Sequence, residues 1–139
     1  MKIKQEYCDL FKYQNSHYLV HCISSDFKLG AGIAVEFNKR YSMRQKLFST
    51  NQISKYPNCI LVDNVFNLVT KELYYLKPSY CSLQRSLDLM KNIVVENNIK
   101  LLAMPKIGCG LDRLQWDKVK FMIEETFADL DVEIIICIK

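Results

Sequence analysis

Short apolar segments alternate with segments of helical periodicity along this 139-residue chain, and this alternation restricts the fold more than any other feature. Apolar runs predict strands at residues 3–7, 18–23, 59–62, 65–70, 101–104 and 132–138. Helical spacing predicts helices over residues 33–41, 43–48, 78–97 and 116–127, with the aromatic residues Trp116, Phe121 and Phe127 in the core. Because alternating strands and helices pack as layers, we expect an α/β fold, a three-layer α/β/α sandwich with a mixed, mostly parallel central sheet.

The bulk properties indicate one domain over residues 1–139, with an apolar content of 50% that is ordinary for a globular protein. The net charge of +4 is mild and no basic run exceeds Lys39-Arg40, so the sequence has no nucleic-acid-binding stripe. Residues 1–6 lack the apolar segment of a signal peptide, and the run 134–138 is too short to cross a membrane. We therefore expect a cytoplasmic (intracellular) protein whose six cysteines are reduced thiols.

The chain's four glycines form two G-x-G loops, each between a predicted strand and a predicted helix. Gly30 and Gly32 precede the first helix, and Gly108 and Gly110 follow the strand at 101–104. Glycine loops before helices let backbone N–H groups approach a phosphate near the positive end of the helix dipole. The same spacing also suits a tight turn with positive φ, and neither loop fits the P-loop or the dinucleotide-binding fingerprint. Two such loops are compatible with a ligand that carries two phosphates.

Two side chains beside these loops can carry chemistry, and each has a simpler explanation. Asp112 lies three residues before Gln115, and this spacing favours a helix capping box over a catalytic carboxylate. Lys71 follows the strand at 65–70, where a lysine usually guards a sheet edge in solvent, although a lysine directed into a cleft becomes a nucleophile. We interpret His21, in an apolar strand, as a core residue, and Cys109, between two glycines, as a small loop residue.

Six segments of the chain resemble the macrodomain family, and within it the terminal ADP-ribose protein glycohydrolases, also described as O-acetyl-ADP-ribose deacetylases. They occur in the family's order across essentially the whole chain and read YCDLF (7–11), HCIS (21–24), LGAGIAV (29–35), VTK (69–71), KPSY (77–80) and MPKIGCGLDRLQW (104–116). The second and the last segment are specific to this class, because other macrodomains usually carry an asparagine-rich segment after the second strand.

The resemblance implies an ADP-ribosyl hydrolase that binds ADP-ribose and cleaves its ester link to Glu or Asp side chains, or the link in O-acetyl-ADP-ribose. It implies that Lys71 attacks the anomeric carbon of the distal ribose, that a lysyl–ADP-ribose adduct forms, and that Asp112 resolves it by acid–base chemistry without a metal or a cofactor. The implied ligand-binding residues are Asp9 and Leu10 at the adenine, Ser24, Gly30, Gly32 and Ile33 in the first loop, and Thr70, Ile107, Gly108, Cys109, Gly110 and Leu111 around the phosphates and the distal ribose.

The chain departs from the family's pattern at two positions. Cys8 replaces a usual glycine beside the adenine contact, and Glu72 follows Lys71 where the family has basic residues. The implied partners are ADP-ribose and ADP-ribosylated proteins or O-acetyl-ADP-ribose, with ADP-ribosylated nucleic acid as a further substrate class. We expect a monomer without membrane contact. A non-catalytic ADP-ribose reader and an ADP-ribose-1″-phosphate phosphatase remain alternative functions.

Overall fold

The computed structural model describes residues 1–51 and 55–139. In these residues one six-stranded sheet has the order β1-β6-β5-β2-β4-β3. Neighbouring strands are parallel except β3 and β4, whose antiparallel pairing follows from the turn at Asp63 and Asn64. The strands are β1 (Lys2–Tyr7), β2 (Tyr18–Ser24), β3 (Asn58–Val62), β4 (Val65–Lys71), β5 (Leu101–Met104) and β6 (Glu133–Ile138). The expectation of a mixed, mostly parallel sheet is confirmed.

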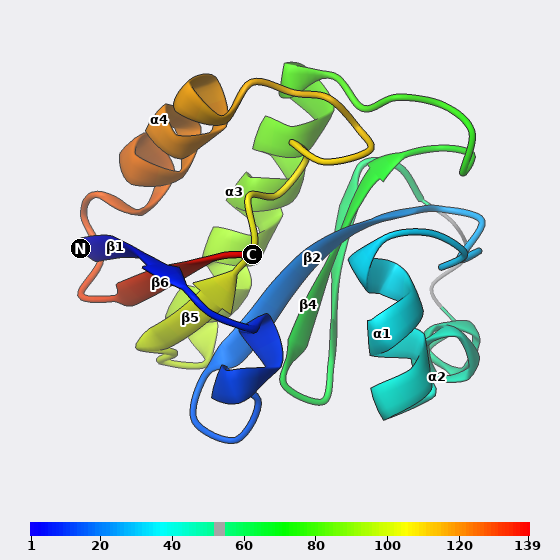
Figure 1. Ribbon diagram of the computed structural model, residues 1–139, viewed down its shortest axis with the longest axis horizontal. Coiled ribbons are helices and arrows are strands. Elements are labelled where there is room, and N and C mark those ends of the chain that lie inside the picture. The colour runs from blue at the N-terminus through cyan, green and yellow to red at the C-terminus, as the bar shows by residue number, and fades with distance from the viewer. Residues whose placement is uncertain (52–54) are drawn as a thin grey trace.

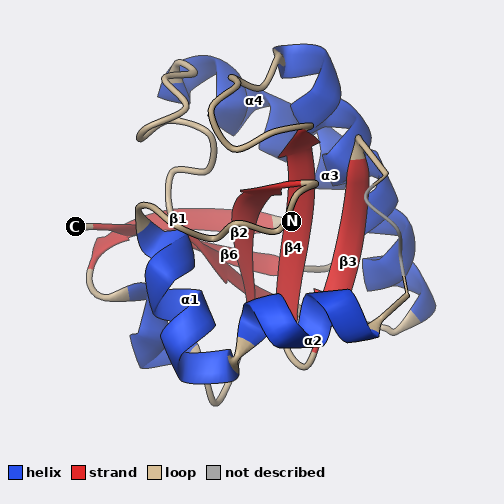
Figure 2. Cartoon of the chain, turned by 90° about the vertical axis from the view of Figure 1, so that its right-hand side faces the viewer, coloured by secondary structure: helices blue, strands red, loops and turns tan. Residues whose placement is uncertain are grey.

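Helices cover both faces of this sheet (Figure 1). α1 (Ile33–Tyr41) and α2 (Met43–Ser49) pack on one face, and α3 (Tyr80–Glu96) and α4 (Trp116–Phe127) pack on the other (Figure 2). A short 3-10 helix over Leu10–Tyr13 was not anticipated from the sequence. No helix in the described part of the chain combines the length and the apolar character that a membrane span requires.

Strand β4, which lies between β2 and the edge strand β3, is buried on both faces because its side chains alternate between two cores. Phe66 and Leu68 pack in the core under α3 and α4, whereas Val65 and Val69 pack in the core under α1 and α2. This double burial holds the strand rigidly up to its last residue, Lys71.

The outer face of α4 corrects one expectation. Phe121 was expected in the core but is 62% exposed. Its neighbours in the helix, Val119 and Ile123, are fully buried. In a helix, a residue two positions away from a buried residue lies about 200° around the axis from it. Phe121 is two positions from both Val119 and Ile123, so it faces solvent.

The strand order creates a crevice between β2 and β5. These two strands are adjacent, but the chain leaves β2 toward β4 and β3, whereas it leaves β5 toward β6. The loops that follow β2 and β5 therefore diverge above the carboxyl ends of the strands. In open α/β sheets ligands bind at such a switch point.

Candidate functional site

A cavity of about 580 Å³, named here the central cavity, opens at the carboxyl ends of β2, β4 and β5. Both glycine loops form its walls, so the fold brings together two segments that lie far apart in the sequence. Ten residues expected at the site line it: Ser24, Gly30, Gly32, Ile33, Lys71, Ile107, Gly108, Gly110, Leu111 and Asp112.

Lys71 and Asp112 form an ion pair at the edge of this cavity. Lys71 Nζ donates a hydrogen bond of 2.8 Å to Asp112 Oδ1, and each side chain is only 15% exposed. Lys71 therefore does not guard a sheet edge in solvent, as its position at a strand end suggested. The pair places a carboxylate within proton-transfer distance of a primary amine.

Asp112 does not cap α4, so the expected capping box is wrong. Gln115 occupies the N-cap position of α4, and no side chain makes a capping hydrogen bond there. Arg113, between the two, adopts a left-handed φ of 65°, which turns the chain before the helix begins. The Asp112 carboxylate is thereby directed to Lys71 instead of to the helix.

The N-terminus of α1 points its positive dipole end at the central cavity. Gly32 is the N-cap with φ of 62°, no side chain caps the helix, and residues 32–34 line the cavity. The first N–H groups of a helix have no partner within the helix, so this end can bind an anion.

The four glycines serve two different purposes: two of them make tight turns, and two leave space beside the cavity. Gly32 and Gly108 have positive φ values of 62° and 72°, as tight turns require. A Cβ at Gly30 or Gly110 would meet no atom within 4 Å, so their missing side chains leave open space beside the cavity. The loops thus combine tight turns with room for a ligand.

Asp26 ties the first loop to the segment that follows Lys71. Its carboxylate accepts hydrogen bonds from Ser24 Oγ, from Lys28 N at 3.2 Å and from Tyr74 N at 2.9 Å. Burial opposes ionisation of Asp26, but these three hydrogen bonds outweigh burial and hold its pKa below the usual range. The three hydrogen bonds therefore stabilise the ionised form of Asp26 and join the first loop to the segment after Lys71.

A second cavity of about 560 Å³ adjoins the first, and the two share Ile33 and Pro105. Asp9 and Leu10, expected at the adenine end, line this adjoining cavity together with Cys8. The Asp9 carboxylate accepts a 3.0 Å hydrogen bond from Phe11 N, and this bond lowers the pKa of Asp9. Asp9 is therefore an ionised acceptor in the adjoining cavity.

Two expected site residues do not line either cavity. Thr70 is buried, and its Oγ1 has no hydrogen-bond partner within the described structure. Cys109 directs its thiol to Ile107 O at 3.3 Å, and burial raises the pKa of Cys109 to about 11. This thiol is unreactive at neutral pH, which agrees with the interpretation of Cys109 as a small loop residue.

His21 is a core residue, as expected, and it also lies beneath the central cavity. Further lining residues that sequence reasoning missed are Cys22, Lys28, Leu29, Tyr74 and Lys106. The sequence around Tyr74 could have indicated its place at the site, because Tyr74 belongs to a run of four large apolar residues directly after Lys71-Glu72.

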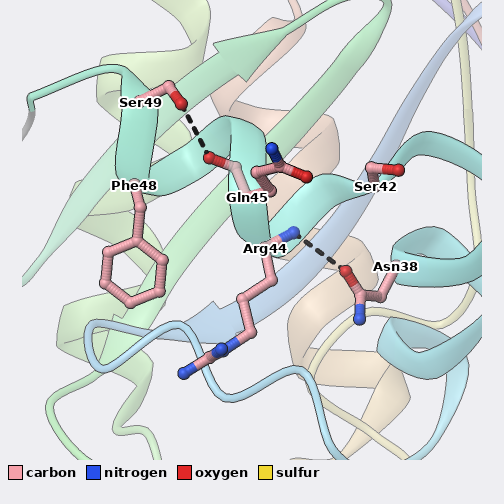
Figure 3. Close-up of a pocket in the computed structure, with 6 residues that line it drawn as sticks. All are labelled: Asn38, Ser42, Arg44, Gln45, Phe48 and Ser49. Carbon is pink, nitrogen blue, oxygen red and sulfur yellow. Dashed lines mark hydrogen bonds between the residues drawn. The ribbon is translucent and has the colours of Figure 1, made fainter.

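A third hollow, of about 630 Å³, lies on the outer surface of α1 and α2 (Figure 3). Asn38 is half-buried there, and the other five lining residues are exposed. Its charged residue, Arg44, is occupied: Nε donates to Phe27 O at 2.9 Å and the guanidinium covers the Phe48 ring. The hollow is larger than the central cavity but holds no paired acid and base, so it is not the candidate site.

Comparison with known sequences finds relatives that are named as ADP-ribose glycohydrolases. It is 43% identical over 128 residues to the ADP-ribose glycohydrolase OARD1 of Homo sapiens, which covers 91% of this chain and 84% of that protein. The Bos taurus protein of the same name is 42% identical over the same share of each chain. No family model matches the chain.

Comparison with solved structures gives the same fold. The macrodomain of Mycobacterium tuberculosis DarG has a TM-score of 0.85 at 23% identity, covering 97% of this chain and 96% of that one. Thermosipho africanus DarTG, solved in complex with ADP-ribose, has a TM-score of 0.82 at 16% identity, covering 99% of this chain and 42% of that one. With these folds and the identity to OARD1, the chain belongs to the macrodomain family, as a relative of the ADP-ribose glycohydrolase OARD1.

Proposed function

We propose that this protein is an ADP-ribosyl hydrolase, which binds ADP-ribose and cleaves ester-linked ADP-ribose from acidic side chains. One observation carries the proposal: the partly buried Lys71–Asp112 pair, at 2.8 Å, borders a cavity walled by two glycine loops. The relation to OARD1, named an ADP-ribose glycohydrolase, supports the same activity.

The two adjoining cavities suggest how ADP-ribose lies. The diphosphate would lie over the N-terminus of α1, where no side chain makes a capping hydrogen bond and Gly32 and Ile33 line the cavity. The adenine would enter the adjoining cavity, where the Asp9 carboxylate is an acceptor for its amino group. The distal ribose would then reach Lys71 and Asp112 at the opposite end of the central cavity.

The pair supports a two-step displacement. Asp112 accepts a proton from the Lys71 ammonium, and the free Nζ bonds to the anomeric carbon of the distal ribose. The carbon–oxygen bond of the ester breaks, and its electron pair leaves with the acceptor's carboxylate, which takes the proton from Asp112. Asp112 then removes a proton from a water molecule whose oxygen replaces Nζ at that carbon. The electron pair of the broken carbon–nitrogen bond returns to Lys71 Nζ, and free ADP-ribose is released. Nζ then takes the proton from Asp112, which restores the starting ion pair.

The decisive experiment measures release of ADP-ribose from a peptide with ADP-ribose esterified to glutamate. We expect Lys71→Ala to lower kcat by at least about 10³-fold, because the nucleophile is lost, while calorimetry still detects ADP-ribose binding. Lys71→Arg keeps the positive charge but supplies no amine nucleophile, so it should be equally inactive.

Lys91→Ala is the matched control, because Lys91 forms a 2.9 Å ion pair with Asp129 on the surface. It should retain wild-type rates. Turnover by Lys71→Ala at the wild-type rate would exclude the lysine mechanism. Wild-type protein that binds ADP-ribose without turnover on any ester would instead be a reader.

A further inference from the structure

Five large apolar side chains are exposed around the mouth of the central cavity. Four are consecutive in the loop between β4 and α3 (Figure 1): Leu73 at 36% exposure, Tyr74 at 58%, Tyr75 at 65% and Leu76 at 38%. The fifth, Leu111 at 63% exposure, comes from the second glycine loop. We name these five residues the rim patch. Tyr74 and Leu111 line the cavity, and the Tyr74 and Tyr75 rings are in contact. Large apolar side chains exposed together beside a cavity typically mark an interaction site.

Hydrogen bonds at both ends of the loop hold the rim patch in place. Near its start, Ser25 Oγ donates to Glu72 O at 2.7 Å and Tyr74 N donates to Asp26 at 2.9 Å. Near its end, Lys77 Nζ donates to Leu111 O at 2.6 Å and joins the loop to the opposite wall of the cavity. The exposed side chains therefore lie on an ordered support, which lowers the entropic cost of binding a partner.

The location of the rim patch identifies which part of a substrate it meets. The loop begins directly after Lys71, and Tyr74, Leu111, Lys71 and Asp112 all line the same cavity. Under the proposed function the distal ribose lies at the Lys71–Asp112 pair. The group esterified to that ribose must then project past the rim patch toward solvent.

The charge around the rim patch favours an acidic partner. Lys28, Lys77 and Lys106 are exposed at the mouth, and Glu72 is an exposed acid there. Lys28 Nζ lies 5.6 Å from the centroid of the Tyr74 ring, and the Tyr74 and Tyr75 rings meet edge to face at 5.4 Å. Lysines interleaved with apolar side chains complement a polypeptide that carries both carboxylates and apolar residues.

We infer that the rim patch binds the polypeptide segment that flanks the ADP-ribosylated acidic residue, so that a modified peptide is cleaved more efficiently than an ester without a polypeptide. This inference rests on the proposed function. The acetyl group of O-acetyl-ADP-ribose has no chain that extends to the patch. Three of the five patch side chains are leucines, which suit a peptide better than the stacked bases of a nucleic acid.

The test compares two substrates that are both esters of the anomeric (1″) oxygen: an acidic, apolar peptide with ADP-ribose on its glutamate, and 1″-O-acetyl-ADP-ribose. We expect Tyr75→Ala to lower kcat/KM for the peptide ester about fivefold and that for the acetyl ester less than about twofold. Tyr75 is suitable because it does not line the central cavity. Phe121→Ala, which removes a ring of similar exposure on α4, is the control and should change neither value.

A binding measurement separates failure of this inference from failure of the proposed function. In Lys71→Ala, calorimetry should show that the modified peptide binds more tightly than free ADP-ribose, and adding Tyr75→Ala should abolish the difference. This readout requires no turnover. Equal affinity for the two ligands, or equal effects of Tyr75→Ala on both esters, would overturn the inference. A larger gain with an ADP-ribosylated oligonucleotide than with the peptide would also overturn it.

Discussion

At the residue scale, the charge of Asp112 can be tested apart from its size. Asp112 Oδ1 lies 2.8 Å from Lys71 Nζ in a pair that is 15% exposed. Asparagine has the same shape, but it cannot accept a proton from the ammonium group. We expect Asp112→Asn to lower kcat on ester-linked ADP-ribose by about 10²- to 10⁴-fold, with the calorimetric Kd for ADP-ribose within about threefold of wild type.

Asp129→Asn controls for the loss of one surface carboxylate, since Asp129 pairs with Lys91 far from the cavity in sequence and in fold. It should leave kcat unchanged. An Asp112→Asn enzyme that turns over at the wild-type rate would show that another group, or water, accepts the proton from Lys71.

Local sequence did not predict that Lys71 and Asp112 form a pair, and the reason is physical. They are 41 positions apart, and they meet only because β4, β2 and β5 are neighbours in the sheet. Spacing near Asp112 suggested a cap, but the left-handed turn at Arg113 moved the helix start to Gln115. Only the resemblance to a family joined the two residues before the fold was known.

At the scale of elements, the first glycine loop offers a matched pair of substitutions. Gly32 has φ of 62°, and a Cβ there would lie 3.4 Å from Leu111 Cδ1. We expect Gly32→Ala to destabilise the protein by about 1–2 kcal/mol, because an L-residue is strained in that conformation. Thermal unfolding of the variant checks this value.

Gly30→Ala should have the opposite profile. Its Cβ would enter open space beside the central cavity, so the melting temperature should not change. Because the methyl group occupies ligand space, we expect ADP-ribose binding to weaken about tenfold, as measured by calorimetry. Unchanged affinity in Gly30→Ala would mean that the ligand does not approach this loop.

Sequence reasoning found both loops because the chain's four glycines occur only there. It did not distinguish their roles, since G-x-G spacing is the same for a turn glycine and for one that leaves space. That distinction depends on φ at each position and on the neighbouring side chain, Leu111 for Gly32 and Leu114 for Gly108.

At the scale of the whole molecule, hydrophobic periodicity predicts the three layers of the fold but not the order of the strands in the sheet. Alternating elements predict a sandwich, and the turn at Asp63 and Asn64 predicts the antiparallel pair β3–β4. The local sequence does not predict that β5 lies beside β2, because both strands are apolar enough to occupy any interior position of the sheet. The crevice between their loops is therefore a property of the assembled sheet.

The centre of this sheet holds a histidine that affects the stability of the entire fold. His21 on β2 and Asn67, its partner on β4, are fully buried, with Nε2 2.5 Å from Oδ1. Asn67 Nδ2 donates to Ile60 O at 3.1 Å, so Oδ1 faces His21 and Nε2 carries the hydrogen. The Phe37 ring stacks on the imidazole at 3.9 Å. Burial, partly opposed by the hydrogen bond to Asn67, lowers the pKa of His21 to about 4.

This low pKa predicts a loss of stability in mild acid. The unfolded chain binds a proton at His21 as the pH falls below 6.5, whereas the folded chain binds it only near 4. The stability that this neutral histidine contributes is therefore complete above the unfolded pKa and declines as the pH falls toward 4, by about 2 kcal/mol between about pH 7 and pH 5.

Urea titrations at these two pH values check the prediction. We expect the free energy of unfolding of wild type to decline between them by about 2 kcal/mol more than that of His21→Gln. His17→Gln, at a less buried histidine, should retain most of the wild-type decline. Parallel curves for wild type and His21→Gln would show that His21 does not titrate in this way.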